Sequence, residues 1–365
     1  MSLLKRLFGI LGGDSRAAVE PKLKQSPSEQ PSRKAEKATA ASAAGSIRLP
    51  SKIDDLMDFG LAKHSLNKRW SVGYWDPGPD AHLNRRKSVR LRDNTTGRVV
   101  AEVNDLERPF SVDVADNGIF GVNDAGPSAE LSANLVIFDA GGKRVYGRAY
   151  KANLFGFSIS PCGRYVASQT CNSSNEDSSI LEIHDVAQQR VLASCMPVAG
   201  WTSEYTFEIE DGELKRVFAR IDRLGRFAYS PTGEFLDAKK FMTARLTKGD
   251  PWTRIRAAGE LVQTDESVKA VKRAYDVVDA TISAFQPGQD SRWLAGAYRL
   301  KGELLEKMDK AGDAIEAYRA ALGLDAKIGV KKRLAAMEKA ASQQPSLKAP
   351  AGHREDGTGS GEVQR

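Results

Sequence analysis

Cysteine and histidine are scarce in this sequence of 365 residues, which has three cysteines and four histidines. Three cysteines cannot form a paired disulfide framework in a chain this long, so the sequence predicts a protein of a reducing compartment, by default the cytoplasm. No histidine lies at metal-binding spacing from another histidine or from a cysteine pair. We therefore expect no metal and no cofactor.

One alternative is a zinc site in the middle of the chain. The spacings of its four candidate ligands match no common zinc pattern, and cysteine is often simply a small core residue. The simpler interpretation is that the cysteines are buried or lie in turns and that the histidine is exposed. The four residues are Cys162, Cys171, His184 and Cys195.

Long apolar runs and catalytic motifs are also missing. No stretch of about 18 apolar residues occurs, so the sequence predicts no membrane-spanning helix. It has no glycine-rich phosphate loop between a strand and a helix, and no nucleophile elbow. The beginning, MSLLKRLFGILGG, is a poor secretory signal because Lys5 and Arg6 interrupt its apolar run. These absences favour a non-enzymatic protein.

The positive charge is unevenly distributed. The net charge is +7, yet residues 51–238 have 22 Lys and Arg against 26 Asp and Glu. The excess lies in residues 1–50, with nine against four, and in residues 239–341, with 20 against 14. A nucleic-acid reader needs a basic face on its folded domain, so the acidic middle region argues against a nucleic-acid partner.

Residues 1–13 predict a short amphipathic helix. At 100° per residue its large apolar side chains fall on one face and its two cations on the other. Residues 14–50 and 342–365 contain almost no large apolar residue, so we expect both to be disordered. The residues that would contact a membrane or a partner are Leu3, Leu4, Lys5, Arg6, Leu7, Phe8 and Leu11.

The N-terminal helix could dock on the protein's own core, but its long tether and its cations favour an external target. That target would be an anionic membrane surface or a partner's groove. A transit peptide is a further alternative, because residues 1–50 are basic and rich in Ser and Ala, although Glu20, Glu29 and Glu36 weaken it. We expect a cytoplasmic protein, with membrane association as an option.

Residues 51–240 are expected to form an all-β domain. From about Trp70 the apolar pattern has period two, in short runs bounded by turn pairs. Three similar segments begin at Phe110, Phe157 and Phe207, at spacings close to one propeller blade. If these segments are repeats, the three phenylalanines should occupy equivalent inward positions.

The phrase SISPCGRYVAS, followed by LEIHDVAQQRVLAS, resembles a blade of a WD-repeat-like β-propeller. The resemblance implies a turn of SPDG type, a strand, and a further strand that ends in Asp. About four blades fit the chain, which is near the lower limit for closure, and the usual Gly-His and Trp-Asp signatures are absent. An open propeller fragment and a β-sandwich are the competing folds.

Residues 250–341 predict a stack of roughly five helices, which begins at the capping pair Asp250-Pro251. Within it, Ala295–Ala326 alternates small and large residues and resembles a tetratricopeptide repeat. The segment departs from that pattern at Lys301, usually apolar, and at Ala326, usually proline. By this resemblance, the residues that pack the repeat are Tyr298, Gly302, Leu305, Ala314, Tyr318 and Ala321.

The same resemblance implies that the first helix of the repeat lines a concave groove for a peptide. Its groove residues would be Arg299, Glu303 and Glu306, although a surface ion pair at i,i+4 explains the first two equally well. The chain as a whole is thus expected to combine a propeller-like antiparallel β domain with a tetratricopeptide-like stack of α-hairpins. The predicted function is that of an adaptor for protein–protein interaction.

The alternative function is a ligand-binding or catalytic β domain, with the helical repeat as an accessory. Two tryptophans, Trp70 and Trp75, lie near the turn Asp76-Pro77-Gly78-Pro79-Asp80, which carries two carboxylates. Paired carboxylates serve acid–base chemistry only in opposed environments. Asp, Pro and Gly are more simply turn formers.

Overall fold

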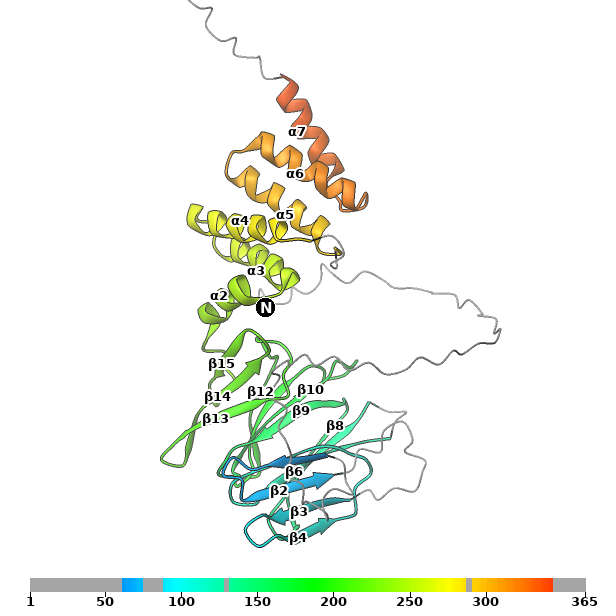
Figure 1. The fold of residues 1–365 in the computed structure, drawn as a ribbon, viewed down its shortest axis with the longest axis vertical. Coiled ribbons are helices and arrows are strands. Elements are labelled where there is room, and N and C mark those ends of the chain that lie inside the picture. Colours follow the sequence, from blue (N-terminus) through cyan, green and yellow to red (C-terminus); the bar gives the residue numbers. More distant parts are fainter. Residues whose placement is uncertain (1–60, 75–87, 128–130, 287–290, 344–365) are drawn as a thin grey trace, which may run out of the picture. The chain divides into compact units, whose positions relative to one another are not determined.

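The computed structural model describes residues 61–74, 88–127, 131–286 and 291–343 (Figure 1). The N-terminal helix expected over residues 1–13, with all its contact residues, lies outside these ranges. So do Trp75 and the turn from Asp76 to Asp80.

Four antiparallel sheets come first in the described chain, and none closes into a barrel. Each sheet is built from strands that are consecutive in sequence, so every pairing is between neighbours along the chain. The first two sheets contain β1 (Leu61–His64), β2 (Trp70–Tyr74), β3 (Val89–Asp93), β4 (Arg98–Val103), then β5 (Pro109–Val114), β6 (Phe120–Ala125), β7 (Ala133–Phe138) and β8 (Arg144–Tyr150). The last two contain β9 (Leu154–Ile159), β10 (Tyr165–Thr170), β11 (Leu181–Asp185), β12 (Arg190–Cys195), then β13 (Tyr205–Glu210), β14 (Glu213–Ile221) and β15 (Gly225–Tyr229).

Helices follow the sheets, which confirms the expected order of β before α. The six helices of the described part are α2 (Ala238–Lys248), α3 (Pro251–Thr264), α4 (Val268–Ser283), α5 (Leu294–Lys307), α6 (Ala311–Leu324) and α7 (Lys331–Gln343).

One type of turn joins the first two strands of three sheets. The turn ends at a residue with positive φ, whose N–H donates to the carbonyl three residues earlier. In the second sheet Gly118, at φ 84°, donates to Ala115 over 3.2 Å, and in the third Gly163, at φ 76°, donates to Ser160 over 2.8 Å. Glycine suits this position because it has no Cβ. In the first sheet Lys68 takes the same place at φ 61°.

Asparagine side chains bridge these turns from one sheet to the next. Asn67, in the β1–β2 turn, donates its Nδ2 to the carbonyl of Asp116 over 3.0 Å. Asn117, in the β5–β6 turn, donates its Nδ2 to the carbonyl of Cys162 over 2.8 Å. An asparagine at the same place in the turn thus makes the same kind of hydrogen bond between the first and second sheets and between the second and third.

The first strands of successive sheets are also joined. The Asp113 carboxylate of β5 accepts from the backbone N–H of Ile159 in β9 over 2.8 Å. One sheet later, the Ser158 hydroxyl of β9 accepts from the N–H of Tyr205 in β13 over 3.0 Å. The accepting side chain is the fifth residue of its strand in both cases, whereas the donor is the last residue of β9 in one and the first residue of β13 in the other.

The expected equivalence of Phe110 and Phe157 is wrong by two residues. Phe157 is 6% exposed and packs in the core between the second and third sheets, whereas Phe110 is 51% exposed. Counting back from the shared turn aligns Phe157 with buried Val112 and Phe110 with Phe155. Phe207 is partly buried against the core of the fourth sheet.

Charged side chains cover the outer face of the fourth sheet. Arg216 pairs with Glu208 over 3.5 Å, and the Arg226 guanidinium lies over the ring of Phe218, 4.7 Å from its centroid. No described strand of the first sheet pairs with a strand of the fourth. Among the described residues, this face of the fourth sheet therefore carries charged side chains around Phe218.

Helix α2 contributes to the core of the fourth sheet. The ring of Phe241 packs edge-on against Phe227 at 4.9 Å between centroids, and Ala244 is buried in the same cluster. The carboxylate of Asp237, just before the helix, accepts from the N–H of Ala228 over 2.9 Å. The domain boundary expected at residue 240 thus falls inside a helix that packs on the sheet.

The hairpin of α5 and α6 has the close approach typical of small residues at a helix crossing. A Cβ atom added to Gly302 would lie 2.5 Å from the ring of Tyr318, which is fully buried. Ala314 and Ala321 are also fully buried, and Leu305 is almost so. Tyr298, by contrast, is partly buried against the cluster shared with α3 and α4.

Lys301 has a specific partner at the position where the repeat pattern usually has an apolar residue. Its Nζ donates to Asp279 of α4 over 2.5 Å, and its ammonium lies 5.9 Å from the ring centroid of Tyr275. The side chain is about three-quarters buried. The lysine that replaces the usual apolar residue is therefore paired with Asp279, an acidic residue of the preceding hairpin.

Candidate functional site

A buried polar network joins the second and third sheets. His184 of β11 is fully buried, and its Nδ1 lies 3.0 Å from the Tyr146 hydroxyl while its Nε2 lies 2.8 Å from the Ser168 hydroxyl. The Tyr150 hydroxyl, 2.9 Å from Ser168, donates to the Glu182 carboxylate over 2.8 Å. Strand β8 is thereby tied to β10 and β11.

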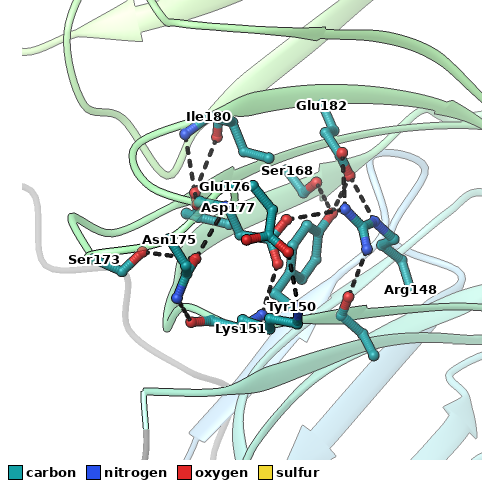
Figure 2. Close-up of polar contacts among 12 residues, drawn as sticks. Arg148, Tyr150, Lys151, Ser168, Ser173, Asn175, Glu176, Asp177, Ile180 and Glu182 are labelled. Atoms are coloured by element: carbon teal, nitrogen blue, oxygen red, sulfur yellow. Dashed lines mark hydrogen bonds and ion pairs between the residues drawn. The ribbon is translucent and has the colours of Figure 1, made fainter.

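Arg148 pairs with both carboxylates of this network (Figure 2). Its Nε donates to Glu182 over 3.1 Å and its Nη2 donates to Asp177 over 3.1 Å. Both carboxylates are almost fully buried, and the guanidinium also lies over the ring of Tyr150, 4.7 Å from its centroid. One partly buried cation thus serves two buried carboxylates.

The network also fixes the loop between β10 and β11, residues 171–180 (Figure 2). Asp177 accepts from the backbone N–H of Lys151 over 2.7 Å, and Asn175 donates its Nδ2 to the carbonyl of the same residue over 2.6 Å. The Lys151 ammonium in turn pairs with Glu176 over 2.8 Å. These three polar contacts hold the long loop against the β8–β9 connection.

His184 does not have the properties of a catalytic or metal-binding histidine. Burial lowers the pKa of His184 to about 4, so the imidazole is neutral, and both ring nitrogens already face hydroxyl groups. Burial also raises the pKa of Tyr150 well above its ordinary value. The expectation that this histidine is exposed is wrong, because β11 is buried on both faces.

The network should make stability depend on pH. The unfolded chain takes up a proton on this imidazole near pH 6.5, whereas the folded protein does so only near pH 4. Between these values the unfolded state binds more protons, so stability falls as the pH falls. We expect a loss of about 2 kcal/mol from pH 7 to pH 5, which the variant His184→Gln should not show. Urea unfolding at both pH values measures this, and equal losses in the two proteins would contradict the assignment.

The three cysteines are free thiols and form no disulfide with one another. Cys162 is exposed in the β9–β10 turn, and Cys171 and Cys195 are partly buried. Within the ranges that the structure describes, no three His, Cys, Asp or Glu side chains are grouped as metal ligands. The zinc alternative gains no support from these positions.

Trp70, one of the two tryptophans of the ligand-binding alternative, is used for packing. It is 8% exposed, and its indole Nε1 donates to the carbonyl of Asp116 over 3.1 Å. Gly118 approaches the indole ring so closely that a Cβ there would lie 3.0 Å from it. The tryptophan therefore holds the β1–β2 hairpin against the β5–β6 turn.

A stripe of charged side chains follows α5, the first helix of the repeat-like hairpin. Arg299 donates its Nε to Glu303 over 2.9 Å, which is the i,i+4 surface pair weighed from the sequence. Glu306, one turn further, accepts from the Tyr318 hydroxyl and pairs with Arg333 of α7 at 2.6 Å. The structure thus brings Arg299 and Glu303 together and uses Glu306 to tie α5 to α6 and α7.

Helix α3 continues this charged surface on the preceding hairpin. Its Glu260 accepts from Arg245 of α2 over 2.9 Å and lies 3.8 Å from Arg256. Helices α3 and α5 are in contact; the α3 carboxylate faces α2, and the α5 stripe faces α6 and α7. Arg256 and Arg299 are each about half exposed, and both are paired only with exposed or half-buried carboxylates.

No family model and no curated protein sequence matches the chain. Among solved structures, it is similar to hydrazine synthase of Kuenenia stuttgartiensis, with 16% identity and a TM-score of 0.32 over 51% of this chain and 49% of that one. It is also similar to a structure described as "Complex of KlAtg21 with coiled-coil of AgAtg16", with 11% identity and a TM-score of 0.33 over 45% of this chain and 50% of that one. The chain spans about half the length of each.

Within the described residues, no helix is both long enough and apolar enough to cross a bilayer.

Proposed function

We propose that this protein is a non-enzymatic adaptor, in which the α3–α7 helical stack binds a segment of a partner protein. The observation that carries the proposal is the charged surface of α3 and α5. It lies on the first helices of two successive hairpins, where Arg256 and Arg299 are each about half exposed and each pairs with a carboxylate of its own helix. Such pairs contribute only about 0.3–0.5 kcal/mol, so an incoming carboxylate can replace Glu303 beside Arg299 at little cost.

The partner segment is expected to be acidic. Residues 239–341 carry 20 Lys and Arg against 14 Asp and Glu, so the stack attracts negative charge. Arginine offers a planar fork that binds a carboxylate through two N–H groups, which gives geometric selectivity as well as attraction. Binding would therefore combine the general charge of the stack with specific contacts at Arg299 and Arg256.

Two finer features belong to the same proposal. We infer that the four sheets are blades of an open, propeller-like domain, which is supported by the shared turn and by the recurring contacts between first strands. We also infer that the stack is tetratricopeptide-like, which is supported by the close approach at Gly302 and Tyr318. Residues 1–13, by their amphipathic pattern, would attach the adaptor to an anionic membrane surface.

Charge reversal at one arginine tests the adaptor function. In the full-length protein, Arg299→Glu should weaken capture of the acidic partner by roughly tenfold to a hundredfold, the range expected for a lost charge-assisted contact. The matched control is Arg319→Glu on α6, since Arg319 is equally exposed and also ion-paired, with Glu338. Co-purification followed by mass spectrometry measures both. A partner that survives the first change, or is lost equally in both, would contradict the proposal.

A further inference from the structure

Two exposed phenylalanines lie at β-bulges near the start of first strands in adjacent sheets. The pairing of β5 with β6 skips Phe110, and the pairing of β9 with β10 skips Phe155. Asn123, which pairs with Ser111 beside the first bulge, donates its Nδ2 to the carbonyl of Leu154 beside the second over 3.2 Å. This hydrogen bond links the surroundings of the two bulges. A bulge re-aims a side chain and is common beside functional sites.

A tryptophan extends this exposed apolar surface. Trp201, in the connection between β12 and β13, packs edge-on against Phe155 with 5.2 Å between ring centroids. Phe110, Phe155 and Trp201 are 51%, 39% and 47% exposed, and Val198 is more than half exposed. We name Phe110, Phe155, Val198 and Trp201 the aromatic face. Large apolar side chains that are exposed together mark an interaction surface, whereas single exposed ones are ordinary.

The rings of the aromatic face lack the cations that cover other rings of this protein. The guanidinium of Arg69 lies 4.9 Å from the ring centroid of Trp70, and that of Arg226 lies 4.7 Å from the ring centroid of Phe218. Within the described residues, no lysine or arginine lies over a ring of the aromatic face. A cation over an aromatic ring is attracted by the electrons of the ring, most strongly over tryptophan. These rings are therefore free to receive a cation from outside the chain.

Two carboxylates without a partner lie just before Phe110. Asp105 and Glu107 are exposed in the β4–β5 connection, and neither forms an ion pair with another described residue. The connection is fixed in place, because the backbone N–H groups of Glu107 and Arg108 donate to the Asp124 carboxylate over 3.1 Å and 2.7 Å. Arg108 is the one cation of the connection, so its two free carboxylates leave an excess of negative charge.

Two neighbouring ion pairs leave this excess unchanged. Glu204, close to Trp201 in sequence, pairs with Arg220 over 2.9 Å. Lys151, just before β9, pairs with Glu176 over 2.8 Å. The β region as a whole also carries more acidic than basic residues, with 26 against 22 over residues 51–238. A surface with free rings and free negative charge is complementary to a ligand that is basic and partly apolar.

We propose that the aromatic face binds a basic segment of a second partner protein. An arginine of that segment would lie over the ring of Trp201, and another would pair with Asp105 or Glu107. Apolar side chains between these arginines would contact Phe110 and Val198. The charge of this segment is opposite to that of the acidic segment proposed for the helical stack, so the inference does not depend on that function. The chain would bind one partner through its sheets and another through its helices.

A labelled peptide tests the inference on the full-length protein. The probe is a fluorescein-labelled peptide in which Gly, Arg and Leu repeat, and its two matched peptides have Glu or Gln in place of every Arg. Fluorescence anisotropy should show saturable binding of the arginine peptide, which weakens as salt is added because screening reduces attraction between exposed charges. The glutamate and glutamine peptides should each bind roughly tenfold more weakly or not at all.

Two variants locate the binding on the protein. Phe155→Ser with Trp201→Ser should weaken binding of the arginine peptide by roughly thirtyfold, as expected for the loss of central aromatic contacts. Asp105→Asn with Glu107→Gln should weaken it by about threefold to fivefold and reduce its salt dependence, because exposed ion pairs contribute less. The second variant changes only exposed side chains, so it tests the inference even if the first variant does not fold.

Matched controls lie elsewhere on the same sheets. Val99→Ser with Val100→Ser removes exposed apolar side chains from β4, and Glu210→Gln with Asp211→Asn removes exposed carboxylates at the β13–β14 turn. Both should bind the arginine peptide as tightly as the unchanged protein. Arg299→Glu should do the same, which separates this inference from the acidic partner of the helical stack. Thermal melts verify that each variant is folded.

Four results would overturn the inference. The first is that the arginine peptide shows no saturable binding at millimolar concentration, and the second is that the glutamine peptide binds equally well. The third is that binding in a folded protein survives the loss of Phe155 and Trp201 or the neutralisation of Asp105 and Glu107. The fourth is that the control variants lose as much affinity as the variants of the aromatic face and its carboxylates.

Discussion

Replacing Phe157 with alanine should lower the free energy of unfolding by about 3–5 kcal/mol. The ring is 6% exposed and fills the core between the second and third sheets. Gly121 of β6 approaches it so closely that a Cβ there would lie 2.7 Å from the ring. A cavity at this position cannot collapse without moving two sheets relative to each other, which is why we expect the upper part of the range. Urea unfolding at pH 7 measures the loss.

Phe110 provides the matched control for this change. It is the phenylalanine that sequence similarity aligns with Phe157, yet it is half exposed on a bulge. Phe110→Ala should therefore change stability by less than about 0.5 kcal/mol. Similar losses for the two variants would mean that the register of β5 or β9 differs from the one described.

The second large effect concerns Arg148. Replacing it with methionine keeps most of the side-chain volume but leaves the buried carboxylates of Glu182 and Asp177 without their cation. Removing one partner of a buried ion pair typically costs about 3–5 kcal/mol. We expect a loss of that size at pH 7, measured by urea unfolding.

A compensating change distinguishes the charge from the packing. Adding Glu182→Gln to the Arg148→Met variant removes one of the two orphaned charges, so part of the lost stability should return. Arg216→Met is the control, because Arg216 is half exposed and pairs with Glu208 on the outer face of the fourth sheet. It should change stability by less than about 1 kcal/mol. No recovery in the double variant would show that Arg148 acts through packing instead.

Local signals in the sequence predicted the order of elements and many of their limits. Strands alternate with turn pairs, and the cap at Asp250 marks the start of α3, where its side chain accepts from the N–H of Thr253 over 2.8 Å. These features depend on residues that are only a few positions apart, so the local periodicity of the sequence is enough to predict them. The packing of α2 on β15, across the expected boundary at residue 240, is a tertiary contact that a local pattern does not report.

The misaligned phenylalanines show that sequence similarity alone does not fix the position of a residue in its strand. FSVDV and FSISP match by sequence, but a strand position is fixed by its distance from the turn. Phe110 and Phe155 both lie eight residues before the glycine of their turn, at Gly118 and Gly163, whereas Phe157 lies six before it. Counting residues back from the turn would have paired Phe110 with Phe155, the two residues at which the register of β5 and β9 shifts.

The buried network was missed because its members come from strands of two sheets. One signal was present in β10, where Ser168, Gln169 and Thr170 follow one another at the end of the strand and are all buried. Three adjacent buried polar side chains require hydrogen-bond partners elsewhere. Which partners these are, such as Tyr150 and Glu182, depends on how two sheets meet.

The neighbour-to-neighbour pairing of every sheet has a consequence for synthesis. Because no described strand waits for a partner from a distant part of the sequence, each sheet can form as soon as its own strands have left the ribosome. The hydrogen bonds from β5 to β9 and from β9 to β13 would then join each new sheet to the one formed before it. We expect chains truncated after Cys195 and released from the ribosome to show protease resistance in their first three sheets, although they contain none of the described helices.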